Sequence, residues 1–104
     1  GHTGVYEAIL KAVETVDQCA NEVVHAAREN GYEVLIIADH GNADNAVNGD
    51  GSPNTAHSLN PVPCILVSDR YEKIDNGVLA DVAPTILKLM EMDIPKEMTG
   101  KVLV

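Results

Sequence analysis

Basic residues are scarce in this sequence, and their scarcity argues against one class of partner. Seven Lys and Arg stand against sixteen Asp and Glu among 104 residues, which gives a formal net charge of -9. No stretch is basic enough to follow a phosphate backbone, so we do not expect nucleic acid as a partner. The acidic surplus itself is typical of a solvated surface.

Long apolar runs and paired cysteines are missing as well. No run approaches the roughly 18 apolar residues of a membrane span, and no charged-then-apolar leader opens the chain, so we expect a cytoplasmic protein without a membrane partner. Cys19 and Cys64 form no CxxC pair, and their apolar neighbours favour buried free thiols over a disulfide or a metal site. The chain begins Gly-His without an initiator Met, which fits a tag remnant or a piece of a longer protein.

The hydrophobic content of 45% is sufficient for the core of one α/β domain. Apolar residues spaced by three and four predict a helix over residues 5–30, with Thr3 as its cap and Glu7 in its first turn. Gly31 ends it. We expect this helix to pack one broad face on a sheet and to leave His25 exposed without a role.

Two apolar stretches predict strands. Residues 34–38 form a continuous apolar run, which predicts a strand over 33–38 that is buried on both faces of a parallel sheet. Residues 62–68 form the second strand, with prolines near its entry, where a missing N–H is tolerated. Two strands are too few for a sheet that is stable alone in water, so we expect either further strands from elsewhere or pairing with another copy.

A second helix is predicted from about Leu79 or Asp81. Asp81 can cap it, and Pro84 then falls in the first turn, where the missing N–H costs nothing. The predicted buried edge consists of four apolar residues: Val82, Ile86, Leu89 and Met90. Residues 94–95, Ile-Pro, end this helix, and a short apolar tail closes the chain.

The segment between the two strands carries the chemistry. Residues 41–60 are rich in Asn, Asp, Gly, Ser, Thr and Pro, and twenty residues without structure are unusual in a compact domain unless they have a function. Asp39 and His40 stand at one end of this segment, and His57 stands near the other. A carboxylate together with imidazoles suits Mn, Fe or Zn better than Ca, which prefers oxygen ligands alone.

Both Asp39 and His40 can reach one ion only if the backbone has left the strand, because neighbours on a strand point to opposite faces. Gly41 permits such a turn. We predict a metal site where two parallel strands bring His40 and His57 to the same edge of the sheet. His2 stands at the start of the first helix, and the sequence does not decide which edge of the sheet it lies near.

Four motifs resemble, in order and spacing, the carboxyl-terminal part of the cofactor-independent phosphoglycerate mutases. They are Gly-His-Thr-Gly at 1–4, Ala-Asp-His-Gly-Asn-Ala at 38–43, Thr-Ala-His at 55–57 and Asn-Pro-Val-Pro at 60–63. The segments at 79–85 and 98–101 also resemble the end of that family's chains. The resemblance covers essentially all 104 residues. It implies that Gly-His-Thr-Gly at 1–4 is a native motif and not a tag remnant.

The resemblance implies a partial alkaline phosphatase-like α/β sandwich, with a mostly parallel sheet flanked by helices. Residues 1–104 would belong to one metal-binding domain without a separate second domain. Asp39 and His40 match ligands of one manganese ion, while His2 and His57 match ligands of another. The family interconverts 3-phosphoglycerate and 2-phosphoglycerate in glycolysis and gluconeogenesis through a phosphoserine intermediate, in which the metals activate the serine and neutralise phosphoryl oxygens.

The departures from the family matter equally. Its nucleophilic serine, further Asp ligands, catalytic lysine and arginine-rich substrate-binding domain would lie before Gly1, and Ser52, Ser58 and Ser68 stand in no matching motif. We therefore expect a monomeric parent enzyme and an inactive 104-residue piece that contains no catalytic nucleophile.

Two alternatives stay open. One is another enzyme of the same superfamily, such as a phosphopentomutase or a phosphodiesterase, although the Asn-Pro-Val-Pro context favours the mutase. The other is a non-catalytic module that self-associates through an exposed sheet edge.

Overall fold

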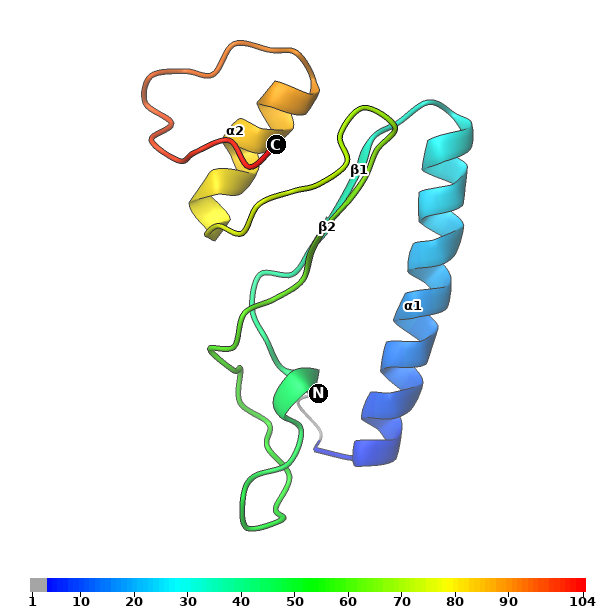
Figure 1. Ribbon diagram of the computed structural model, residues 1–104. Helices are drawn as coiled ribbons and strands as arrows, with labels where there is room; N and C mark the ends of the chain where they lie inside the picture. The colour runs from blue at the N-terminus through cyan, green and yellow to red at the C-terminus, as the bar shows by residue number, and fades with distance from the viewer. Residues whose placement is uncertain (1–3) are drawn as a thin grey trace. The chain divides into compact units, whose positions relative to one another are not determined.

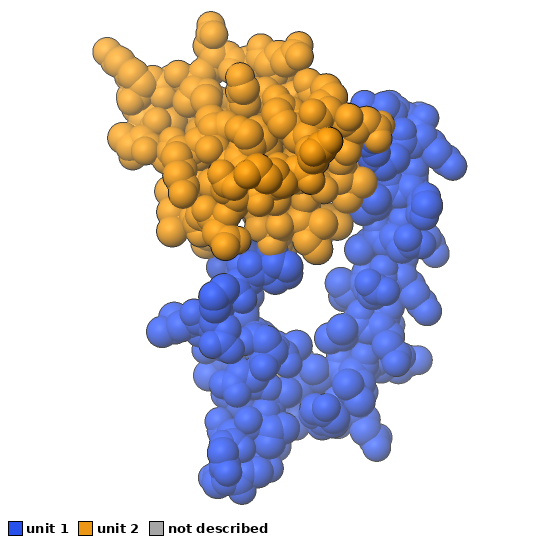
Figure 2. Space-filling model, in the orientation of Figure 1, with its two compact units in different colours: residues 1–32, 38–63 blue, residues 33–37, 64–104 orange. Residues whose placement is uncertain are grey.

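Two compact units make up the chain in the computed structural model, which describes residues 4–104 (Figure 1). Unit 1 combines the described residues up to Tyr32 with residues 38–63, and unit 2 combines residues 33–37 with residues 64–104 (Figure 2). The chain therefore passes from unit 1 to unit 2, back to unit 1 and again to unit 2. None of the helices found in these residues has the length and apolar character needed to cross a membrane.

Helix α1, Tyr6–Glu29, belongs to unit 1 and confirms the predicted first helix. Its end is the one the sequence indicates: Gly31 has a φ of 79°, a conformation that glycine adopts without a Cβ clash. The N–H of Tyr32 donates to the carbonyl of Ala27 at 3.0 Å, and the N–H of Gly31 donates to Arg28 at 3.1 Å. This Schellman pattern satisfies the last carbonyls of the helix. The predicted cap Thr3 lies outside the described residues.

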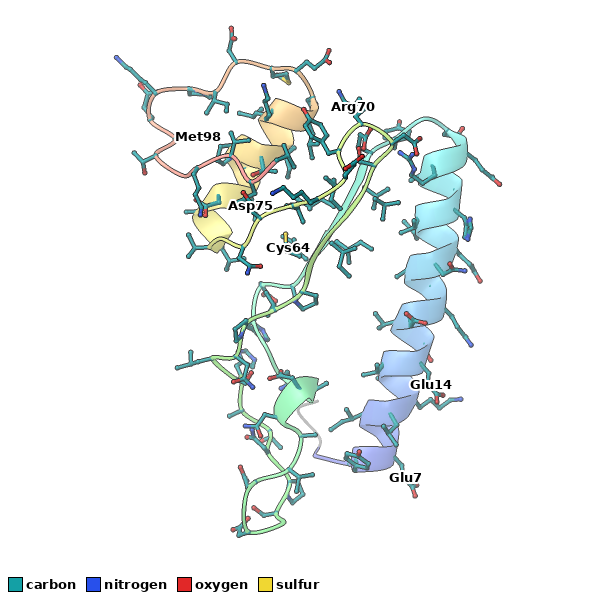
Figure 3. The ribbon with its side chains drawn as sticks, viewed as in Figure 1. Glu7, Glu14, Cys64, Arg70, Asp75 and Met98 are labelled. Carbon is teal, nitrogen blue, oxygen red and sulfur yellow. The ribbon has the colours of Figure 1, made fainter. Side chains whose placement is uncertain are left out.

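The broad buried face expected for α1 is wrong. Ile9 is its one buried residue, while Val13 and Val16 are 51% and 66% exposed. Besides α1, the described part of unit 1 contains only a 3-10 helix, so this unit has no second long element to cover the apolar stripe. Glu7 and Glu14 also project from the helix (Figure 3).

Three smaller predictions concern the cysteines and His25. Cys19 and Cys64 are free, as expected, but Cys19 is exposed because it lies on α1, and Cys64 is half-buried. Their predicted burial is thus wrong for Cys19. His25 is exposed, as predicted.

Strands β1, Val34–Ile37, and β2, Cys64–Val67, form a two-stranded antiparallel sheet in unit 2 (Figure 1). The predicted parallel pairing is wrong. A parallel pair needs a crossover, usually a helix, whereas the connection between these strands contains only a 3-10 turn and returns the chain beside β1. The strands are half-buried where full burial was expected, with Ile37 and Ile65 among their exposed residues.

The core of unit 2 lies against helix α2, Val82–Leu89, which follows the 3-10 helix η2, Leu79–Asp81. Leu89 and Leu103 are buried beside Thr85, which is completely covered. The N–H of Leu103 donates to the Thr85 hydroxyl at 3.0 Å, so the carboxyl-terminal tail packs on this side of the helix.

The predicted buried edge of α2 is therefore wrong for two of its residues. Ile86 and Met90 are 40% and 61% exposed, whereas Asp81, Thr85 and Leu89 are buried at spacings of four. The buried side is displaced by one residue because the tail covers the side of the helix that carries the Thr85 hydroxyl.

Asp81 holds unit 2 together in a way that differs from the predicted cap. Its side chain makes no cap bond to α2; it accepts the N–H of Val78 and the N–H of Lys101, each at 2.9 Å. These two donors, Val78 first, lower the pKa of the Asp81 carboxyl. Pro84 does stand in the first turn of α2, as predicted.

Arg70 connects three more segments of unit 2. Its Nε donates to Glu33 Oε1 at 3.1 Å, its Nη1 donates to Glu91 Oε1 at 3.2 Å, and its Nη2 donates to the carbonyl of Leu89. Arg70 follows the end of β2, whereas Cys64 begins that strand (Figure 3). The guanidinium thereby ties the start of β1, the exit of β2 and the end of α2.

Candidate metal centre

Antiparallel pairing brings the two ends of the polar segment together. Ile37, the last residue of β1, pairs with Cys64, the first residue of β2. Parallel strands would have put the end of one and the start of the other at opposite edges, so the predicted meeting of His40 and His57 depends on the opposite strand direction. Their imidazole rings are stacked, with centroids 3.6 Å apart and planes 12° apart.

Within unit 1, the residues that follow the two histidines are paired directly. Gly41 and Ser58, which directly follow the two histidines, form an isolated antiparallel bridge in which the Ser58 N–H donates to the Gly41 carbonyl at 2.8 Å. The Asn42 amide donates to the carbonyl of Ala56 at 3.2 Å. These bonds hold two stretches of the chain at a short separation: residues 39–44, which include His40, and residues 56–60, which include His57. We call these stretches the two legs of the polar segment.

The rest of the polar segment is ordered by its own side chains. It contains the 3-10 helix η1, Ala43–Asn45, and a second bridge between Val47 and Pro53. The Asn54 side chain donates to the carbonyl of Asn45 at 2.8 Å. The segment thus folds back on itself, and Asn side chains add to the backbone bonds from Asn48 to Ser52 at 2.8 Å and from Asn54 to Ala46 at 2.9 Å.

His40 is oriented by a backbone carbonyl. Its Nδ1 lies 3.0 Å from the oxygen of Gly41, which can only accept a hydrogen bond, so Nδ1 carries the proton. The Nε2 atom then presents its lone pair, which is the arrangement found in metal-ligating histidines. Nε2 lies 3.7 Å from Asp39 Oδ1.

Asp39 and His40 fit one metal ion. Nitrogen and oxygen ligands lie about 2.0–2.2 Å from an ion such as Zn²⁺. Two such ligands at angles between roughly 90° and 110° are about 3.0–3.5 Å apart. The observed 3.7 Å needs only a small closure of the pair. Because β1 ends at Ile37, the backbone has left the strand before both residues, as the sequence requires.

The stacked histidines fit two neighbouring ions better than one. The lone pair of an imidazole lies in its ring plane, and planes this close to parallel do not meet within bonding distance of both rings. Ions held in the two planes would be separated by at least about the ring spacing of 3.6 Å. Two-metal sites have ions about 3.5–4 Å apart.

The ligand set within the described residues is incomplete. From residue 4 to residue 104, no three His, Cys, Asp or Glu side chains lie close enough together to hold one ion. The predicted ligand His2 lies outside the described residues. A cavity of about 460 Å³ in unit 2 includes none of the predicted ligands; it is lined by Arg70, Tyr71, Glu72, Lys73, Asp75, Leu103 and Val104.

Three residues of the site were not identified from the sequence. Asp44 Oδ2 accepts hydrogen bonds from the Ser58 hydroxyl at 2.7 Å and from the Asn60 amide at 2.6 Å. These bonds, that of Ser58 first, lower the pKa of the Asp44 carboxyl. The signal available in the sequence was their position, since short polar side chains follow each predicted histidine ligand within four residues.

Gly41 is required where these groups meet. A Cβ on this residue would lie 2.1 Å from the Ser58 hydroxyl and 2.6 Å from Asp44 Oδ1, so no other residue fits without displacing them. Gly41 is also buried.

Comparison with known proteins defines the class of this chain. The family model of the Metalloenzyme superfamily matches residues 1–94, and the chain belongs to this superfamily. Curated relatives are named 2,3-bisphosphoglycerate-independent phosphoglycerate mutase, which confirms the resemblance seen in the motifs.

Three of these relatives show the extent of the match. The protein of Bacteroides fragilis is 62% identical over 101 residues, which cover 96% of this chain and 20% of the relative. Those of Parabacteroides distasonis and Bacteroides thetaiotaomicron are 60% and 59% identical over 105 residues, covering 100% of this chain and 21% of each relative. The chain spans about a fifth of the length of the curated relatives it matches.

Proposed function

We propose that these residues are part of a 2,3-bisphosphoglycerate-independent phosphoglycerate mutase that interconverts 3-phosphoglycerate and 2-phosphoglycerate through a phosphoserine intermediate. The observation that carries the proposal is identity of 59–62%, along all or nearly all of the chain, to relatives of that name. The stacked histidines support it, because their geometry suits a pair of ions.

In this proposal Asp39 and His40 hold one manganese ion, and His57 and His2 hold the other. The Gly41 carbonyl keeps the His40 proton on Nδ1 and so leaves Nε2 free to bind. Bound cations would neutralise phosphoryl oxygens and activate the serine.

The remaining parts of the enzyme would come from other segments of the protein. We assign residues 1–104 to the metal-binding domain of an alkaline phosphatase-like sandwich, in a cytoplasmic and monomeric enzyme. Two features of the described residues support the assignment to a larger domain: the exposed apolar stripe of α1 and a sheet of two strands. Both are surfaces that further elements of such a domain would cover.

A chimera tests the proposal. The matching segment of the Bacteroides thetaiotaomicron relative is replaced by residues 1–104, and turnover is measured with Mn²⁺ and without bisphosphoglycerate. We expect activity within about tenfold of the relative, since the sequences agree closely. His40→Ala and His57→Ala should each reduce it by at least about 100-fold, because a metal ligand matters more than the outer groups worth 10–100-fold. His25→Ala, on an exposed residue of α1, is the matched control.

A folded chimera without turnover, beside an active relative, contradicts the proposal. The 104 residues alone should be inactive, since they contain no matching nucleophile, and turnover by them would show that the nucleophile lies within this chain. Addition of Mn²⁺ to the same polypeptide should broaden the NMR signals of Asp39, His40 and His57. Unbroadened signals would mean that the partial site is not preformed.

A further inference from the structure

The Asp44 carboxylate is the cross-link between the two legs that carry His40 and His57. Asp44 lies on η1, four residues after His40, on the first leg. Its two donors, Ser58 and Asn60, lie 14 and 16 residues further along, on the second leg directly after His57. One oxygen atom, Oδ2, accepts both bonds.

We propose that Asp44 is a positioning residue, whose carboxylate holds Ser58 and Asn60 and thereby keeps the His57 ring stacked on that of His40. The proposal rests on the proposed function, because it takes these histidines to be metal ligands.

Ser58 transmits the constraint. Its hydroxyl is held by Asp44 at 2.7 Å, and its N–H is held by the Gly41 carbonyl at 2.8 Å. A residue fixed through both its side chain and its backbone fixes the peptide before it, and that peptide belongs to His57. The Gly41 carbonyl also bonds His40 Nδ1. The same short stretch of structure therefore orients both rings.

Asn60 adds a second point of attachment. Its amide reaches the Asp44 oxygen at 2.6 Å from two residues beyond Ser58, so the leg cannot pivot about a single bond. Bonds to a charged acceptor are shorter and stronger than bonds between neutral groups. Both bonds, that of Ser58 first, lower the pKa of the Asp44 carboxyl and so favour its ionised form.

A second aspartate in the same segment provides the contrast. Asp50 Oδ1 accepts the Ser52 hydroxyl at 2.6 Å and the Ser52 N–H at 2.9 Å. These bonds resemble those of Asp44 in type and length, but they close a turn only two residues wide. Asp50 therefore braces the tip of the segment, whereas Asp44 joins its two legs.

The experiment compares variants of the intact protein by two measurements. The first, made without metal, is the chemical shift of the His40 and His57 ring protons, which stacking at 3.6 Å displaces through the ring current. The second is affinity for Mn²⁺. Asp44→Ala should remove the ring-current displacement and weaken Mn²⁺ binding by about 10–100-fold, the range for groups that orient ligands.

Conservative and control variants sharpen the comparison. Asp44→Asn should stay within a few-fold of wild type, because its carbonyl oxygen can accept both bonds. Asp50→Ala should change neither measurement. Wild-type shifts and affinity in Asp44→Ala would overturn the proposal, and so would equal losses in Asp50→Ala.

Separate controls distinguish a failure to fold from a failure of the proposed function. If Asp44→Ala does not fold, Ser58→Ala removes one donor and leaves the carboxylate; it should displace the His57 signals, and unchanged signals would overturn the proposal. Mutase turnover of the wild-type protein tests the proposed function. The ring shifts need neither metal nor substrate, so they test the positioning role even if that turnover is absent.

Discussion

Asp44 in unit 1 and Asp81 in unit 2 use the same chemistry in contrasting surroundings. Each carboxylate accepts two hydrogen bonds and reaches a segment distant in the sequence. Asp44 binds Ser58 and Asn60, and Asp81 binds the distant Lys101 as well as the nearby Val78. Asp81 is only 4% exposed, beside a buried core, whereas Asp44 is exposed. The buried link stabilises packing, and the exposed link leaves the neighbouring side chains accessible to a ligand.

The apolar packing of the two units shows the same contrast, with more burial in unit 2 than in unit 1. Unit 2 buries Leu89 and Leu103 around Thr85, while Ile9 is the buried hydrophobic residue of unit 1 in the described chain. Unit 1 relies on hydrogen bonds among polar side chains. We therefore expect substitutions in the core of unit 2 to change stability and substitutions near the histidines to change binding.

The largest loss of stability is expected from truncation of a buried leucine of unit 2, such as Leu103→Ala. This side chain is 4% exposed, and truncation of a buried leucine costs about 2–5 kcal/mol of unfolding free energy. Leu59→Ala, at a fully exposed residue of unit 1, is the control and should stay within about 0.5 kcal/mol. Chemical denaturation measures both. If Leu103→Ala also abolished the His40–His57 ring-current displacement, the division of roles between the units would fail.

Protonation of Asp81 in acid should lower the free energy of unfolding by an amount between the largest and the smallest of these effects. Its pKa is lower in the folded protein than the ordinary value of 3.8, so the unfolded chain binds the proton first as the pH falls. The stability that the ionised group contributes is complete above pH 3.8 and is lost as the pH falls through the lower, folded-state pKa. Melting curves of wild type and Asp81→Asn should therefore differ at pH 7 and converge in strong acid. A constant difference down to pH 2 would contradict this account.

The smallest loss of stability is expected from Ile86→Ala. The helical pattern predicts this residue to be buried, but it is 40% exposed, so Ile86→Ala should cost less than about 1 kcal/mol. Leu89→Ala, three residues further along the same helix at 8% exposure, should cost about 2–5 kcal/mol. Equal losses in the two variants would restore the buried edge predicted from the sequence.

Local features were predictable because their causes are local. The periodic apolar residues of α1 specify a helix, and Gly31 ends it because it adopts a left-handed backbone without strain. Asp39, His40 and His57 were identifiable as ligand types by their chemistry and motifs. Their assignment to particular ions stays a prediction.

Direction and packing were not predictable in the same way. A continuous apolar run is compatible with either strand direction, and the run of β1 carried no information about the route of the chain after it. The route through the polar segment made the sheet antiparallel. Similarly, α2 is apolar on more than one side, and the contact of Leu103 with Thr85 decided which side is buried.

The sequence by itself therefore determined the first helix, the existence of the strands and the identity of the side chains suited to a metal, because each depends on neighbouring residues alone. The tertiary structure decided that β1 and β2 run in opposite directions and so bring His40 and His57 together. It also decided that Asp44 joins the two legs across 14 and 16 residues. These last features require distant parts of the chain to meet, and hydrogen bonds between them form only once the backbone has folded.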